Sequence, residues 1–272
     1  MTETAHTPGG IAYDRAGPRT DLPVVLLHAG IADRRMWNPQ WERLITRRDV
    51  VRLDLRGFGD SVQPPTGADS PLDDVLDTLA VLEIGRCHLV GASFGAGIAV
   101  EVALTRPELV ASLLLSAPGG SLMAEASPDL RAFFDAENSA LAAGDLDAAV
   151  EANLRCWVDG PHRGAAEVDP VVREMVRQMQ RRAFEIGADW VIDQRDLDPP
   201  AHERLSEVRA PTLVLVGALD VDAIQVTARR VAEGIPNAER VDWPDTAHLP
   251  SMERPDDFLA LLEDWLARQT TE

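Results

Sequence analysis

One serine of this 272-residue chain lies in a setting that favours nucleophilic chemistry. Ser93 is the centre of Gly91-Ala92-Ser93-Phe94-Gly95, which follows an apolar run at 87–90 and precedes a helix-like run at 96–104. A sharp strand-to-helix turn forces such a serine into an unusual backbone conformation and requires very small residues two positions away on either side. The N-terminus of the following helix offers free N–H groups and a positive dipole end to an oxyanion. The pattern predicts Ser93 as a nucleophile.

A nucleophilic serine needs a base, and the chain restricts which residue type can serve. All 26 basic residues are arginine, so a lysine base, a lysine Schiff base and a P-loop lysine are excluded. Histidine is then the natural base. Among the six histidines, His248 lies in a loop between the last predicted strand and the last predicted helix, where it can reach the edge of a sheet. His88 is expected to be structural within a strand, and His6 to lie in a frayed N-terminal segment.

The base in turn needs an acid that orients it. Asp220 directly follows the apolar run 211–217, so its carboxylate can reach the same edge of the sheet. Asp222 is the nearest competitor, while the segment 117–120 after an earlier predicted strand holds no acid. The predicted catalytic residues therefore occur in the order Ser93, Asp220, His248.

The elements around these residues predict an α/β fold. Short runs with little polar alternation indicate strands that are covered on both faces, as in a parallel sheet flanked by helices; they occupy 24–27, 50–54, 88–90, 112–116, 211–217 and 240–243. Helical patterns lie between them and at the end of the chain, at 37–47, 72–82, 94–104 and 256–268. We expect a mostly parallel central sheet with helices on both faces, formed by 1–120 and 206–272. Residues 121–205 carry helical patterns with almost no strand signal and are expected to form a helical insertion.

Composition narrows the possible partners. Hydrophobic residues at 45% and charged residues at 26% are ordinary for a globular protein. The net charge of −19 argues against nucleic acid or an anionic membrane as a partner. No run is long and apolar enough to span a membrane, and no secretory signal is visible, so a cytoplasmic protein is expected. Cys87 and Cys156 have no metal-binding spacing and are expected to be small buried hydrophobes. We predict a small-molecule substrate and neither cofactor nor metal, with the oligomeric state left open.

Four motifs in this order resemble those of the α/β-hydrolase fold superfamily. The segment 91–95 resembles the nucleophile elbow, and Asp54-Leu55-Arg56-Gly57-Phe58-Gly59-Asp60-Ser61 resembles the family's D-x-R-G-x-G-x-S loop. The segment 217–220 is similar to the acid turn, and 248–255 is similar to the histidine segment H-x-P-x-x-E-x-P. The resemblance covers nearly the whole chain and implies a serine-nucleophile member of the capped esterase and enol-lactonase kind, in which 121–205 is the cap.

The resemblance also implies an oxyanion hole. Members usually carry His-Gly after the third strand, whereas this chain has His28-Ala29-Gly30-Ile31. Aligned on the downstream Met-Trp pair, Gly30 takes the position of one backbone donor, and Phe94 supplies the other. His28 is expected to brace this loop, and Asp54 and Arg56 are expected to be structural.

The predicted cap carries apolar and basic side chains. Most of its large apolar residues are expected to pack internally, with one or two facing the cleft; they are Phe133, Phe134, Trp157, Met175, Met179, Phe184 and Trp190. The arginines of the insertion are expected to form a solvated helix face, or alternatively to bind a carboxylate of the substrate; they are Arg173, Arg177, Arg181 and Arg182.

The function that these residues favour is hydrolysis of a small carboxylic ester through an acyl-enzyme. The same three residues could instead act on an enol-lactone, on a C–C bond next to a ketone, or in cofactor-free perhydrolysis. A ligand receptor built on a hydrolase fold is the alternative outside enzymology.

Overall fold

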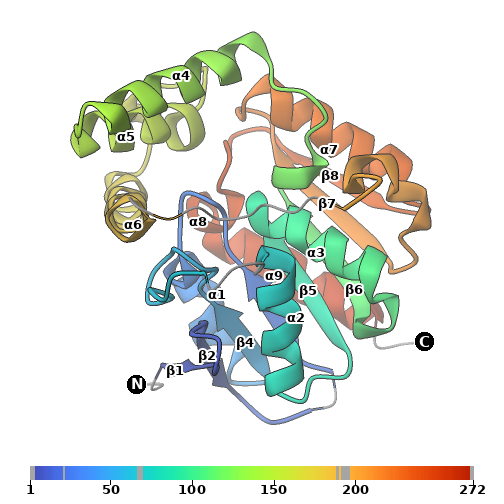
Figure 1. Cartoon of the computed structure of the whole chain (residues 1–272). Coiled ribbons are helices and arrows are strands. Elements are labelled where there is room, and N and C mark those ends of the chain that lie inside the picture. Colours follow the sequence, from blue (N-terminus) through green and yellow to red (C-terminus); the bar gives the residue numbers. More distant parts are fainter. Residues whose placement is uncertain (1–3, 21, 66–69, 188–189, 191–196, 270–272) are drawn as a thin grey trace.

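A computed structural model describes residues 4–20, 22–65, 70–187, 190 and 197–269, and this part of the chain forms an eight-stranded sheet (Figure 1). The strand order is β1-β2-β4-β3-β5-β6-β7-β8. The strands from β3 to β8 pair in parallel, whereas β1 and β2 are antiparallel to their neighbours. The strands are β1 Ala5–His6, β2 Ala12–Ala16, β3 Val24–Leu27, β4 Val50–Leu53, β5 Cys87–Ala92, β6 Val110–Ser116, β7 Thr212–Gly217 and β8 Glu239–Trp243.

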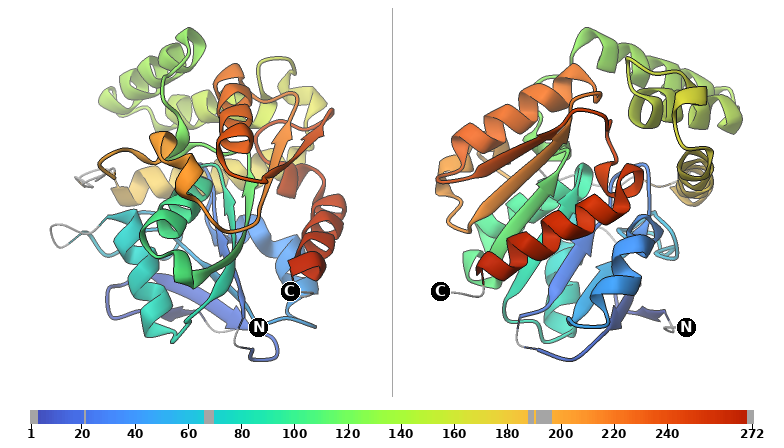
Figure 2. Two further views of the ribbon diagram at one scale, coloured as in Figure 1. Left: turned by 90° about the vertical axis from the view of Figure 1, so that its right-hand side faces the viewer. Right: turned by 180° about the vertical axis from the view of Figure 1, so that it is seen from behind.

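Helices cover both faces of the sheet. The helices are α1 Asn38–Leu44, α2 Pro71–Val81, α3 Phe94–Thr105, α4 Pro128–Ala142, α5 Leu146–Asn153, α6 Pro170–Gly187, α7 Asp222–Gly234, α8 Pro250–Glu253 and α9 Pro255–Gln269. Helices α2 and α3 lie on one face, and α1 and α9 pack together on the other (Figures 1 and 2). Helices α4, α5 and α6 are grouped beyond one end of the sheet (Figure 1). None of the described helices has the length and apolar character that crossing a membrane requires.

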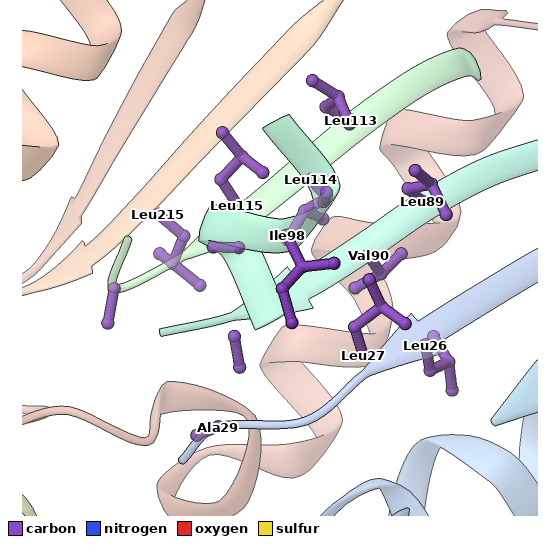
Figure 3. Close-up of a cluster of buried hydrophobic side chains, with 14 of the residues drawn as sticks. Leu26, Leu27, Ala29, Leu89, Val90, Ile98, Leu113, Leu114, Leu115 and Leu215 are labelled. Carbon is purple, nitrogen blue, oxygen red and sulfur yellow. The ribbon is translucent and has the colours of Figure 1, made fainter. Parts of the chain in front are cut away.

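The core explains the apolar strand patterns. Every residue of β3, β5, β6 and β7 is buried. Figure 3 shows Leu27, Val90 and Leu115 from three of these strands gathered around Ile98 of α3. A strand that is packed on both faces has no exposed position to fill with a polar residue, so it reads as a continuous apolar run.

Local sequence fixes where several helices begin. The Ser70 hydroxyl accepts a hydrogen bond from Asp73 N at 3.1 Å, and the Asp73 carboxylate accepts one from Ser70 N at 3.3 Å. This reciprocal capping box, with Pro71 in the first turn, satisfies two amide groups that α2 itself cannot bond. Helix α3 is different, because the side chain of its N-cap residue, Ser93, does not cap it.

The predicted α/β architecture is confirmed, but some of its strands and helices were missed. The N-terminal segment is not frayed, because His6 belongs to β1, which pairs with β2. Strand β2 is an Ala-Tyr-Asp-Arg-Ala segment near the edge of the sheet, so it lacks the apolar run that marks the inner strands. Helix α7 was not predicted either. Its apolar residues recur at helical spacing among polar and charged ones, which is the signal for a helix. This pattern begins directly after the turn that contains Asp220.

The loop after β4 is held by buried polar contacts. The Asp54 carboxylate accepts hydrogen bonds from Arg34 N and Asp60 N, both at 2.8 Å, and also pairs with the Arg34 guanidinium. The Ser61 hydroxyl donates to Asp54 O at 2.7 Å. Arg56 forms an ion pair with the buried Asp74. These contacts give Asp54 and Arg56 the structural positions expected for them.

Stability should fall at acid pH through His88. Burial, followed by the nearby charges of Arg48 and Arg86, lowers the pKa of His88 from 6.5 to about 4. Because the unfolded chain then binds more protons than the folded one between these values, the free energy of unfolding should decrease as the pH falls from 6.5 to 4, by at most ~1.4 kcal/mol per pH unit for this group. Urea unfolding at several pH values should show that the free energy of unfolding depends less steeply on pH in His88→Asn than in the wild type. The control variant His162→Asn, at an exposed position, should keep the pH dependence of the wild type. An unchanged pH dependence in His88→Asn would contradict the contribution assigned to His88.

Candidate functional site

Ser93 occupies a strained turn between β5 and α3. Its φ of 50° and ψ of −110° lie outside the conformations that residues with side chains usually adopt. Ser93 N donates to Ser116 O at 2.9 Å, which ties the turn to β6. Its hydroxyl lies 2.7 Å from His248 Nε2. The serine that would ordinarily cap α3 is thus turned toward a histidine 155 positions further along the chain.

Two glycines make this turn possible. A β-carbon built on Gly91 would lie 2.4 Å from Gly95 O, and one built on Gly95 would lie 2.5 Å from Leu27 O. Both distances are shorter than any real contact, and both involve backbone that cannot move freely. The small residues of the predicted elbow are therefore required by the close approach of β3, β5 and α3.

His248 connects Ser93 to Asp220. Its Nδ1 lies 2.7 Å from Asp220 Oδ2, and the other carboxylate oxygen accepts a hydrogen bond from Val221 N at 2.8 Å. His248 and Asp220 are both buried. Since an ionised carboxylate can only accept, Nδ1 carries the proton and Nε2 accepts the serine hydroxyl. The structure therefore brings the three predicted residues together, whereas Asp222 is the exposed first residue of α7 and makes no contact with His248 among the contacts of the described residues.

The loop that carries His248 is fixed by contacts that the sequence did not predict. A β-carbon on Gly217 would lie 2.2 Å from Thr246 O, so the end of β7 packs directly against this loop. The Glu253 carboxylate accepts a hydrogen bond from Ala247 N at 2.9 Å and forms a 2.8 Å ion pair with Arg163. Burial raises the pKa of Glu253. Arg163 belongs to the helical segment 121–205, which therefore helps to hold the histidine.

Backbone N–H groups lie beside Ser93. Gly30 and Phe94 line the same cavity as Ser93, and neither amide donates a hydrogen bond to any described residue. His28 supports the loop before Gly30, because its Nε2 accepts from Leu55 N at 2.8 Å and its Nδ1 donates to Ala29 O at 2.8 Å. Burial lowers the pKa of His28, which keeps the ring neutral.

A cavity of about 660 Å³ opens above Ser93. Trp157, in the π-helical turn Leu154–Asp159, packs against the His248 ring with 4.5 Å between centroids. Four of the large apolar residues of segment 121–205 line the cavity, more than the one or two expected; they are Phe133, Phe134, Trp157 and Phe184. The other three, Met175, Met179 and Trp190, are not among its described lining residues.

The arginines of α6 do not face this cavity. Arg173 pairs with Asp159 at 2.8 Å and with Glu151 at 2.7 Å, and Arg177 pairs with Glu151 at 3.0 Å. Arg181 pairs with Asp147 of α5, and Arg182 is exposed. The three paired arginines tie α6 to α5 and its continuation, and none of the four is among the described residues that line the cavity.

The cysteines and the remaining acids offer no metal centre in the part of the chain that the structure describes, since no three His, Cys, Asp or Glu side chains are grouped to hold an ion. Cys87 is buried as expected, and burial raises the pKa of its thiol to about 12. Cys156 is only half-buried, which differs from the expectation, because one side of its turn faces the protein surface.

Comparison with known proteins identifies the family. The model of the family described as "Alpha/beta hydrolase family" matches residues 24–261. The chain is 30% identical over 250 residues to "Putative carbamate hydrolase RutD" of Rhizobium rhizogenes, covering 88% of this chain and 91% of that one. A thermophilic esterase from Thermogutta terrifontis is similar in structure, with a TM-score of 0.77, 26% identity and coverage of 99% and 98%. The enol-lactonase from Burkholderia xenovorans LB400 gives a TM-score of 0.76, 26% identity and coverage of 97% and 100%.

The chain therefore belongs to the alpha/beta hydrolase family. The fold class and the hydrolase class predicted from the sequence are confirmed.

The close approach at Gly95 can be tested directly. Gly95→Ala places a β-carbon against Leu27 O, so the turn must shift, and such overpacking typically costs about 1–3 kcal/mol. We expect a lower midpoint in thermal unfolding together with displacement of Ser93 from His248. Gly85→Ala is the matched control, because nothing lies within 4 Å of a β-carbon there. Equal unfolding midpoints in the two variants would show that the Gly95 contact is not restrictive.

Proposed function

We propose that the protein is a serine hydrolase of small carboxylic esters, including cyclic ones, and that Ser93, His248 and Asp220 are its catalytic residues. The observation that carries the proposal is the hydrogen-bonded series from Ser93 through His248 to Asp220, with 2.7 Å at each step, beside an apolar cavity. Membership of the alpha/beta hydrolase family supports the same reaction class.

The proposed mechanism uses each group according to its contacts. His248 Nε2 removes the Ser93 proton as the hydroxyl oxygen attacks the substrate carbonyl. Asp220 holds the protonated ring in place and stabilises its positive charge. His248 then passes the proton to the leaving alcohol, and an acyl-enzyme remains on Ser93. His248 removes a proton from water as the water attacks this ester, and then returns that proton to the Ser93 oxygen as the acid is released.

The backbone amides of Gly30 and Phe94 are the proposed oxyanion hole. Phe94 begins α3, so its N–H has no partner within the helix, and it adjoins the nucleophile. A preorganised donor of this kind typically contributes ~2.7–4 kcal/mol to stabilisation of the transition state. Residues 121–205 are the proposed cap domain, inserted between core segments 1–120 and 206–272, because their aromatic side chains form the cavity wall above Ser93.

The substrate class follows from the cavity and from the relatives. A volume of about 660 Å³ with an aromatic wall suits a small organic ester. Similar proteins named an esterase and an enol-lactonase act, by those names, on open and cyclic esters. The relative whose name specifies a carbamate extends the candidates to another acyl derivative that the same attack can cleave.

Ser93→Ala should abolish ester hydrolysis, because the hydroxyl that becomes acylated is removed. The measurement is turnover of p-nitrophenyl esters from acetate to decanoate by the wild type and the variant, with circular dichroism as the control for folding. A correctly folded variant that retains more than a few per cent of the activity would remove Ser93 from the nucleophile role.

Asp220→Asn should lower kcat by roughly 10³-fold or more, because the amide no longer holds His248 in the required tautomer. Asp222→Asn is the matched control, two residues away and exposed, and should retain nearly full activity. Both variants are assayed with the best p-nitrophenyl ester of the series. A larger loss in Asp222→Asn would reassign the acid.

A further inference from the structure

The wall of the cavity opposite the core carries hydrogen-bond acceptors that the ester chemistry does not use. Gln180 of α6 lines the cavity and is only 4% exposed. Its Oε1 is enclosed and has no hydrogen-bond partner among the described residues. A buried carbonyl oxygen without a partner is costly, so it points to a donor that a ligand supplies.

Glu137 of α4 is the second acceptor. It lines the same cavity, and its Oε1 accepts a hydrogen bond from Asn153 Nδ2 at 2.5 Å. The same amide nitrogen donates to Ala149 O at 3.0 Å, so both of its hydrogens are used and the side chain is fixed. Burial raises the pKa of Glu137, and the hydrogen bond from Asn153 lowers it in part. A neutral amide leaves the charge of the carboxylate uncompensated.

Among the described residues that line the cavity, none is a cation placed to neutralise Glu137. Arg56 is the one arginine among the described lining residues, and it is paired with Asp74. Of the two histidines in the lining, His248 is bonded to Ser93 and Asp220, and His202 lies 3.4 Å from Ser121 O. The arginines of α6 are paired or exposed outside the cavity. The described part of this wall therefore supplies no countercharge to Glu137, and a cationic ligand would supply one.

Aromatic rings separate the acceptors from the reacting centre. Trp157 lies against His248, and Phe133 lies against Trp157 at 5.5 Å with its edge toward the ring. Phe133 and Glu137 are four residues apart on α4, so they lie on the same face of that helix, one turn apart. Trp157 and Phe133 thus form an apolar part of the lining between His248 and the face of α4 that carries Glu137, which suits an alkyl spacer.

We propose that the preferred substrates are esters or lactones that carry a protonated amine, separated from the scissile carbonyl by a short apolar chain. Glu137, oriented by Asn153, supplies the countercharge, and Gln180 Oε1 accepts an N–H of the substrate. This inference rests on the proposed ester hydrolysis at Ser93 and specifies its substrate class.

The test compares two esters of nearly equal shape. Methyl 6-aminohexanoate and methyl heptanoate differ in a terminal ammonium or methyl group, and 6-aminohexyl acetate and heptyl acetate place the same difference on the alcohol side. We expect the wild type to have a kcat/KM at least tenfold higher for the amine in one of the two pairs, which also identifies the side that faces Glu137. Equal values or a preference for the alkyl ester in both pairs would overturn the proposal.

The variant Glu137→Gln should reduce the ratio of kcat/KM between the amine and alkyl esters at least tenfold. Asp135→Asn, an exposed carboxylate on the same helix, is the matched control and should keep the wild-type ratio. A Glu137→Gln variant that loses activity equally on both esters keeps the ratio, and that result would overturn the proposal.

A binding experiment separates this inference from the proposed reaction. In calorimetry, the dissociation constant of hexylammonium should be at least tenfold higher for the double variant Ser93→Ala/Glu137→Gln than for Ser93→Ala. Equal dissociation constants for the two proteins, with heptyl acetate hydrolysis still dependent on Ser93, would reject the ammonium site and leave the proposed function standing. Heptyl acetate hydrolysis that is independent of Ser93 would reject the proposed function, and the calorimetric result would still decide the ammonium site.

Discussion

The backbone conformation of Ser93 is the constraint on which the rest of the site depends. A positive φ at a residue with a side chain costs about 1–3 kcal/mol and persists only where the surroundings enforce it. Here Ser93 N is bonded to β6, and Gly95 N donates to His28 O at 3.2 Å beside β3. Two central strands therefore hold the turn from either side. Because these strands hold the turn, the Ser93 hydroxyl projects away from the sheet and toward His248.

The acid turn and the histidine loop are assembled by equally close packing. Gly217 leaves room for the backbone at Thr246, and a β-carbon on Gly160 would lie 2.5 Å from Leu219 O. Gly160 belongs to the helical segment, as does Arg163, which reaches Glu253 behind the His248 loop. The helical segment is therefore more than a cover for the cavity. It forms part of the support that holds the segments carrying Asp220 and His248.

This arrangement places the proposed reacting groups and the proposed ligand-binding wall on different elements. The strand ends and their loops supply the serine, the histidine, the acid and the free backbone amides. Helices α4 and α6 and the π-helical turn Leu154–Asp159 supply the aromatic wall, and α4 and α6 also carry the acceptors Glu137 and Gln180. Ion pairs between α6 and the segment that includes Glu151 and Asp159 fix the helices relative to each other. Changes on those helices can alter the ligand while the reacting groups stay in place.

The sequence alone predicted the parallel sheet, its covering helices and the grouping of Ser93, Asp220 and His248 that the structure shows. These features have short-range signals: continuous apolar runs for strands packed on both faces, and small residues or acids at strand ends. The same rule explains the misses, since β2 carries edge-strand polarity and β1 is only two residues long. A signal confined to a few neighbouring residues fails where pairing with a distant segment decides the structure.

Only the tertiary structure decided which side chains of segment 121–205 face the cavity. Successive residues of a helix point in directions about 100° apart, so a small rotation of α4 would exchange Glu137 for a neighbour. Composition cannot distinguish Phe184, which lines the cavity, from Met179, which is buried elsewhere. The contacts of Arg163 with Glu253 likewise join positions far apart in the chain. The sequence specified the proposed reacting groups, and the packing of the helices decided which side chains surround the cavity beside them.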